Sequence, residues 1–318
     1  MASITLLALL WGSAALYGAP CANPYPAAKI IHDQRETITF ATENGDFMIC
    51  SLQNGRVIKK FKRPVGSIDS LAIDKSGNYL IAGGYSMHLQ LFNLARGSHI
   101  RTIERDTWAP VNVLHGRNLF YLSMGNMIQV RTYKDGQLEE KLIGHEKDIR
   151  QLILSPDKKW LLSAAADKVR LWPFPDLKRP GRDYALIKST AVAFHNEGQH
   201  FFAAVKREKD YQLSQVNVKT AHTRELVTMP RRIGMIYHDH PNEQLIFQSG
   251  RALHFLDLSA KKQKMISHSY REYGLGQVHF WPQRNLLVSF QLRTGLMQLW
   301  KLKKGDLAPW GAIRSGFK

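Results

Sequence analysis

One unit of about forty residues recurs along most of the chain, and it constrains the fold more than any other feature. Each copy has a short apolar run, a tight polar turn and a second apolar run. After a link comes a third run that often ends on an aromatic residue. The clearest copy spans 152–172, where Ser155-Pro156-Asp157 supplies turn chemistry between two β-prone runs.

The residue that ends each first apolar run marks the repeat. These anchors are spaced 40 to 43 residues apart, and they are His32, Asp74, His115, Ser155, His195, His238 and Trp281. Helical periodicity is absent, so the pattern predicts an all-β chain. A sheet of three or four such strands cannot bury both faces alone, and we expect the seven units to form a single seven-bladed β-propeller. The outermost strand of the last blade has two candidates, 25–28 and 307–313.

The fourth copy carries residues that a known family places at fixed points of its repeat, namely Gly144-His145, Asp148, Ser163, Asp167 and Trp172. On these residues, and on the repeat length, the chain resembles the WD-repeat family of β-propellers over about residues 27 to 310. The resemblance implies a structural role for a hydrogen-bonded network of His145, Ser163, Asp167 and Trp172. Pro173 stands where the family has Asp, and the other six units lack the Gly-His pair.

The beginning of the chain is typical of an export signal. Residues 4–19 are apolar except for Thr5 and Ser13, and Pro20 follows them. The run is short for a membrane span but suits a secretory signal peptide. We therefore predict a signal peptide over 1–22, a mature propeller over 23–318, and a periplasmic or secreted location. An uncleaved segment would instead leave the protein in the cytosol.

Positive charge narrows the class of partner. The chain has 44 Lys and Arg against 26 Asp and Glu, a formal net charge of +18. Such a charge excludes an acidic disordered chain and attracts anionic partners. We expect an acidic protein partner, or another anionic surface, and no nucleic acid if the chain is exported. Arg and aromatic side chains dominate interface hot spots, so the predicted contacts are Arg231, Arg232, Arg251, Arg293, Trp108 and Tyr270.

No catalytic pattern stands out in the sequence. It lacks a phosphate-binding loop, a nucleophile elbow and a calcium loop. His238-Asp239-His240 has the spacing of two metal ligands on one strand face, but its place in the repeat assigns His238 to capping a turn. His195 and His200 flank the same turn one repeat earlier. We therefore expect neither a metal nor a cofactor.

The predicted function is a non-enzymatic docking scaffold, exported and acting as an accessory subunit of an envelope assembly. Two alternatives remain open. One is a propeller enzyme, or a cofactor- or metal-binding protein, whose site in the central channel draws residues from separate repeats. The other is a cytosolic scaffold in an RNA or protein assembly.

Overall fold

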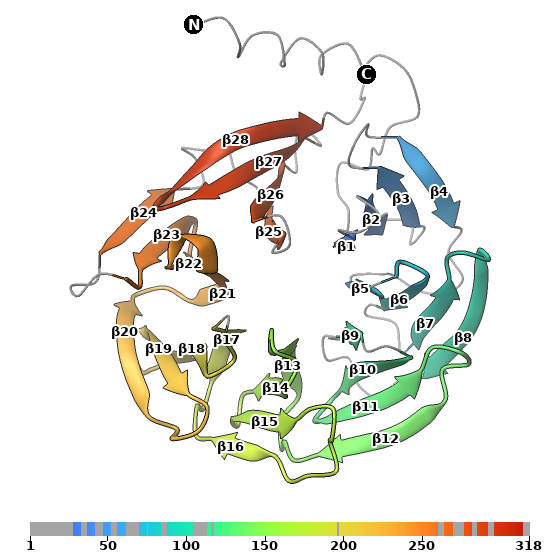
Figure 1. The fold of residues 1–318 in the computed structure, drawn as a ribbon, viewed down its shortest axis with the longest axis horizontal. Helices are drawn as coiled ribbons and strands as arrows, with labels where there is room; N and C mark the ends of the chain where they lie inside the picture. The colour runs from blue at the N-terminus through green and yellow to red at the C-terminus, as the bar shows by residue number, and fades with distance from the viewer. Residues whose placement is uncertain are drawn as a thin grey trace, which may run out of the picture. The chain divides into compact units, whose positions relative to one another are not determined.

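A computed structural model shows the chain as a series of β-strands (Figure 1). It describes residues 28–32, 37–41, 47–51, 56–61, 70–74, 76–83, 88–104, 113–115, 118–195, 197–259, 264–269, 277–281, 285–291 and 296–313. Within these ranges no helix is long and apolar enough to cross a membrane. The expected signal peptide over 1–22 lies outside the described residues.

The strands form seven four-stranded sheets, each made of four consecutive strands (Figure 1). The first three are β1–β4 (Ala28–His32, Thr37–Ala41, Phe47–Ser51, Val57–Phe61), β5–β8 (Ser70–Ile73, Tyr79–Gly83, His88–Asn93, Ser98–Glu104) and β9–β12 (Val113–His115, Leu119–Met124, Met127–Thr132, Leu138–Ile143). The next two are β13–β16 (Ile149–Leu154, Trp160–Ala165, Val169–Pro173, Arg182–Tyr184) and β17–β20 (Ser189–Phe194, His200–Lys206, Tyr211–Asn217, Thr223–Met229). The last two are β21–β24 (Ile233–Asp239, Gln244–Ser249, Ala252–Asp257, Met265–Ser269) and β25–β28 (Gln277–Trp281, Leu286–Gln291, Leu296–Lys303, Asp306–Ile313).

Seven consecutive four-stranded sheets are the architecture of an all-β, seven-bladed β-propeller, which confirms the predicted fold class. The last blade takes β28 as its fourth strand, so the candidate over 307–313 is correct. Residue 28, from the other candidate, begins β1 in the first blade.

The chain groups into two compact units. One comprises residues 1–99, 274–301 and 308–318, and the other comprises residues 100–273 and 302–307. The first unit contains a buried cluster formed by Ile49, Phe61, Leu71, Ile73, Leu80, Ala82, Phe92 and Leu94. In the second unit, buried apolar side chains pack between one sheet and the next, as Leu171 and Tyr184 pack with Phe194 and Phe201. Each sheet of this unit therefore buries a face against its neighbour.

Local turn chemistry explains where the first strands end. Ser155 follows β13, and its Oγ accepts the Trp160 N–H at 3.0 Å. Asp74 follows β5, and its Oδ1 accepts the Tyr79 N–H at 2.6 Å. These side chains satisfy backbone donors that a turn would otherwise leave unpaired.

The sixth repeat departs from its predicted anchor. His238 pairs with Leu245, just as Phe194 pairs with Phe201 one sheet earlier, so His238 occupies a strand position that is apolar there. Asp239, opposite Gln244, stands at the turn position. Its Oδ2 accepts the side-chain N–H of Gln244 at 2.7 Å. The assignment of His238 to capping the turn is therefore wrong by one residue.

Candidate functional site

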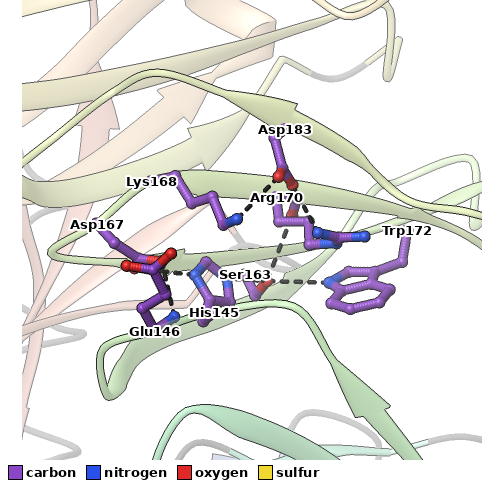
Figure 2. A network of polar contacts seen from close by, with 8 residues as sticks. All are labelled: His145, Glu146, Ser163, Asp167, Lys168, Arg170, Trp172 and Asp183. Atoms are coloured by element: carbon purple, nitrogen blue, oxygen red, sulfur yellow. Dashed lines mark hydrogen bonds and ion pairs between the residues drawn. The ribbon is translucent and has the colours of Figure 1, made fainter.

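A connected polar network joins the β13–β16 sheet to the link that precedes it (Figure 2). His145 Nδ1 lies 3.1 Å from Asp167 Oδ1, and its Nε2 lies 2.8 Å from Ser163 Oγ. The indole N–H of Trp172 donates to the same Ser163 Oγ at 2.9 Å. The structure thus brings together all four residues to which the resemblance assigns a structural role.

The contacts of Ser163 favour one protonation state of His145. Ser163 Oγ accepts from Trp172, and its own hydrogen can go to the Arg170 carbonyl at 3.4 Å or to His145 Nε2 at 2.8 Å, which is the nearer of the two. His145 is then a neutral imidazole whose Nδ1–H donates to the Asp167 carboxylate. Burial lowers the pKa of His145 and outweighs the opposing effect of Asp167, which agrees with the neutral form.

Asp167 also joins two segments at this edge of the sheet. Its Oδ2 accepts the Glu146 N–H at 2.9 Å, which ties the link between β12 and β13 to the turn between β14 and β15. This contact restrains Glu146, which lines a hollow at the surface together with Lys147 and Asp148.

A serine that contacts a histidine, which in turn contacts an aspartate, is also the arrangement of a hydrolase catalytic triad. Here the chemistry is unavailable to a substrate, since Ser163 is 0% exposed and His145 is 4% exposed. The Ser163 oxygen is also engaged by Trp172. The arrangement suits a buried structural contact rather than a nucleophile.

A second layer of charge covers the network on the outer part of the sheet (Figure 2). The Arg170 guanidinium lies 4.6 Å from the centre of the Trp172 ring and 2.9 Å from Asp183 Oδ1. Lys168 Nζ lies 2.9 Å from the other Asp183 oxygen. A Cβ at Gly144 would stand 2.6 Å from Arg170 Nη1, so Arg170 and any side chain at 144 would compete for space. The contacts of Lys168, Arg170 and Asp183 were not predicted from the sequence.

Three sheets of the second unit have a β-bulge at the same position of their first strand. The ladder skips Arg150 in β13, Thr190 in β17 and Gly234 in β21. Side chains from these strands bridge the sheets: Thr190 Oγ1–H donates to the Ile233 carbonyl at 2.8 Å. A bulge releases its extra residue from strand pairing and redirects its side chain.

The three bulged residues line one hollow of about 770 Å³. Its lining consists of Glu146, Lys147, Asp148, Arg150, Gln151, Ala166, Thr190, Arg232 and Gly234. A Cβ built at Gly234 would meet no atom within 4 Å, so the space above this glycine is open. Three cationic side chains and two carboxylates surround the hollow, which therefore offers charges of both signs to a partner.

The predicted contact residues fall into two groups. Arg231, Arg232 and Arg251 are exposed at one edge of the β21–β24 sheet, and Arg232 lines the hollow. Arg231 packs over Gly250, whose Cβ position lies 2.8 Å from Arg231 Cδ, next to Arg251. The other three predicted contacts, Trp108, Tyr270 and Arg293, lie outside the described residues. The hollow adds Lys147, from the link between β12 and β13, and Arg150, whose bulge has no residue signature in the sequence.

A cluster of His195, His238 and His240 lies near the turn that follows β21, at the opposite end of this strand from the hollow. The rings of His195 and His238 stack with their centroids 4.3 Å apart. The ligand atoms of His238, His240 and Glu243 lie within 4.8 Å of one another. Burial, with His195 and His240 nearby, lowers the pKa of His238 to about 3, so its imidazole is neutral at physiological pH. Neutral imidazoles and a carboxylate are groups that can hold a divalent metal ion.

Comparison with known proteins identifies related sequences. Residues 136–172 match the family model described as WD domain, G-beta repeat. Over 223 residues the chain is 24% identical to the Set1 complex component swd2 of Schizosaccharomyces pombe, covering 66% of this chain and 61% of that protein. It is 23% identical over 137 residues to U3 small nucleolar RNA-associated protein 21 of Saccharomyces cerevisiae, covering 42% and 15%. The chain therefore matches less than two thirds of the length of each of these relatives.

Solved structures show the same fold. The structure of U3-55K superposes with a TM-score of 0.62 at 15% identity, covering 86% of this chain and 89% of that one. The Cps50 (Swd1) beta-propeller domain of Myceliophteria thermophila superposes with a TM-score of 0.63 at 12% identity, covering 90% and 98%. At these identities the likeness establishes the fold alone.

The relatives overturn the predicted periplasmic or secreted location. They come from yeasts and, in the case of WD repeat-containing protein 36, from human, and two are named for the Set1 complex and for U3 small nucleolar RNA. The prediction rested on an apolar run near the N-terminus. No Lys or Arg precedes that run, although a signal peptide normally begins with a positively charged segment. Apolar composition alone was therefore too weak a signal to assign export.

Proposed function

Because this chain is a seven-bladed β-propeller of the WD-repeat family, we propose that it is a non-enzymatic scaffold subunit of a cytosolic or nuclear assembly. Its role there is to dock a protein partner. The relatives support this assignment, since their names place them in a Set1 complex or with a small nucleolar RNA. The observation that carries the proposal is the hollow over the bulged strands β13, β17 and β21.

The form of the hollow suits docking. Its lining side chains come from three successive sheets that share inter-sheet hydrogen bonds, such as the one from Val192 N–H to Gln151 Oε1 at 2.8 Å. Arg150, Gln151 and Thr190 stand on strands, which hold their backbone in place and reduce the entropy lost on binding, and the other charged lining residues come from the adjoining links. Lys147 is exposed at this site, where it can contact acidic side chains of a partner, and Arg150 is exposed beside it.

The charge pattern favours protein over RNA as the occupant. Glu146 and Asp148 line the same hollow as Arg150 and Arg232. Phosphate groups of a nucleic acid would meet these carboxylates at short range, which opposes binding. A peptide can instead place acidic groups against the arginines and a donor against the carboxylates.

The proposal is tested by capturing partners from cells of the source organism with the full chain and with the double variant Arg150→Glu and Arg232→Glu. We expect a stoichiometric protein partner that survives ribonuclease and that the double variant loses. A photo-crosslinking residue at exposed Lys147 should join the same partner, which places it at the hollow.

Arg224→Glu is the control for a charge reversal outside the hollow and is compared with Arg232→Glu alone, because Arg224 is exposed on β20 and does not line the hollow. It should retain the partner. Equal capture by the double variant would move docking away from the hollow. A partner released by ribonuclease would show that the contact runs through RNA and would overturn the choice of protein.

A further inference from the structure

We propose that His238, His240 and Glu243, at the turn following β21, form a binding site for a divalent transition-metal ion, with Zn²⁺ as the ion that suits it best. The proposal is independent of docking at the hollow. It reverses the expectation, drawn from the sequence, that this segment holds no metal.

Backbone structure brings the three ligands together. His238 lies near the end of β21, His240 begins the 3-10 helix η2 (His240–Asn242), and Glu243 follows that helix in the left-handed conformation with φ 49°. Their ligand atoms lie within 4.8 Å of one another, and His240 Nδ1 is 3.2 Å from Glu243 Oε1. An ion held at the ligand distances of about 2.0 to 2.2 Å that Zn²⁺ requires would draw these atoms closer together.

Strand register explains why this turn differs from the other turns. The residue at the place of His238 is Phe194 in the β17–β20 sheet and Leu154 in the β13–β16 sheet, each paired like His238 with an apolar residue. Asp239 serves the turn, so turn geometry does not require a histidine at 238. The histidine at 238 therefore departs from the repeat, and it places an imidazole beside His240 and Glu243.

Neighbouring groups hold the turn rigid. Asp239 Oδ2 accepts side-chain N–H groups of Asn242 at 2.8 Å and of Gln244 at 2.7 Å. Gln244 is fixed in turn by the link between β27 and β28, where its Nε2–H donates to the Lys303 carbonyl at 2.7 Å and its Oε1 accepts the Gly305 N–H at 2.8 Å. These bonds fix the turn whose backbone carries the three proposed ligands.

The donor set indicates the ion. Two imidazoles and one carboxylate suit Zn²⁺, and three protein ligands leave a fourth position for water. His238 is buried, whereas the side chains of His240 and Glu243 are each 48% exposed, so the ion can enter from solvent. His195 stacks on His238 and restricts the orientation of its ring.

The test is Zn²⁺ binding to the full, tag-free chain after treatment with a chelator, measured by calorimetry and by the rise in Tm that Zn²⁺ causes. Co²⁺ absorption provides a second signature of coordination by imidazole and carboxylate. We expect one ion per chain, and we expect His240→Ala and Glu243→Gln each to weaken Zn²⁺ binding at least about tenfold. Both side chains are partly exposed, and Glu243→Gln keeps the side-chain shape. This variant should therefore fold, and its Zn²⁺ affinity can be compared with that of the wild type.

His222→Ala is the control, because His222 is exposed on the link between β19 and β20 and is absent from the cluster. It should bind Zn²⁺ like the wild type. Unchanged affinity in His240→Ala and Glu243→Gln would place the ion elsewhere and overturn the proposal. Absence of binding at about 100 μM Zn²⁺, far above the affinity of dedicated sites, would also overturn it.

Discussion

Gln151 reaches from β13 to the next sheet, where its side-chain Oε1 accepts the Val192 N–H of β17 at 2.8 Å. The bond stands beside the bulge in each of the two strands. A similar hydrogen bond joins the following pair of sheets, where Thr190 Oγ1–H of β17 donates to the Ile233 carbonyl of β21. Directed hydrogen bonds therefore join successive sheets of the second unit, in addition to apolar packing.

Replacing Gln151 by Ala should lower the free energy of unfolding by about 1 to 2 kcal/mol, because the Val192 N–H loses its partner in a largely buried position. Urea unfolding followed by Trp fluorescence measures this change. Gln137→Ala is the control, since Gln137 is exposed in the link between β11 and β12. Equal stability of the two variants would show that the inter-sheet bond contributes nothing.

Replacing Trp172 by Ala should cost about 3 to 5 kcal/mol, because a buried indole is removed and a cavity remains. Trp172→Phe retains most of the packing and removes the N–H that donates to Ser163, so its cost should be about 1 to 2 kcal/mol. Chemical denaturation of both variants separates the two contributions. Unchanged stability in Trp172→Ala would refute a structural role for the network.

Stability should depend on pH through His145. Burial lowers its pKa in the folded state below the usual 6.5, although Asp167 and Asp183 act in the opposite direction and Lys168 assists. As the pH falls, the unfolded chain takes up the proton first. The stability from neutral His145 is therefore complete above about pH 6.5 and is lost as the pH falls from there through the lowered pKa.

Unfolding free energies at pH 7.5 and pH 5 measure this dependence. His145→Gln should lose less stability between the two pH values than the wild type does. His222→Gln, at an exposed position, should behave like the wild type. A variant at 145 whose stability still falls as steeply as that of the wild type would contradict the assignment.

Gly234 offers a test of the hollow that leaves every charge in place. Its Cβ position faces open space, so Gly234→Ala should change the unfolding free energy by less than about 0.5 kcal/mol. Gly234→Trp should also fold, but its indole would fill the hollow and reduce partner capture at least about tenfold. Thermal unfolding and quantitative pull-down of the two variants give the comparison. Equal capture by both would place the partner elsewhere.

The repeat and its turns were readable from the sequence because their chemistry is local. Ser155 and Asp74 cap the residues that follow them, so the side chain that ends the strand is also the side chain that the turn needs. Seven such signals at near-constant spacing were enough to predict seven blades. The positions of His145 and Trp172 followed from the resemblance to a family whose repeat fixes both.

What the sequence did not indicate depends on backbone register. In the sixth repeat the 3-10 helix after Asp239 alters the turn, and the anchor expected at His238 was displaced by one residue. A bulge requires no particular side chain, so Arg150, Thr190 and Gly234 share no feature that a pattern could detect. The hollow therefore became apparent only in three dimensions.

The bulges also separate strand pairing from ligand contact, two requirements that a surface residue on a strand usually has to meet together. A paired residue must suit both the ladder and any ligand, whereas Arg150, Thr190 and Gly234 stand outside the ladder. Substitutions at these three positions can alter what the surface selects while the sheets keep their pairing. The fold thus contains a small set of exchangeable positions through which a single scaffold can acquire a different specificity without being rebuilt.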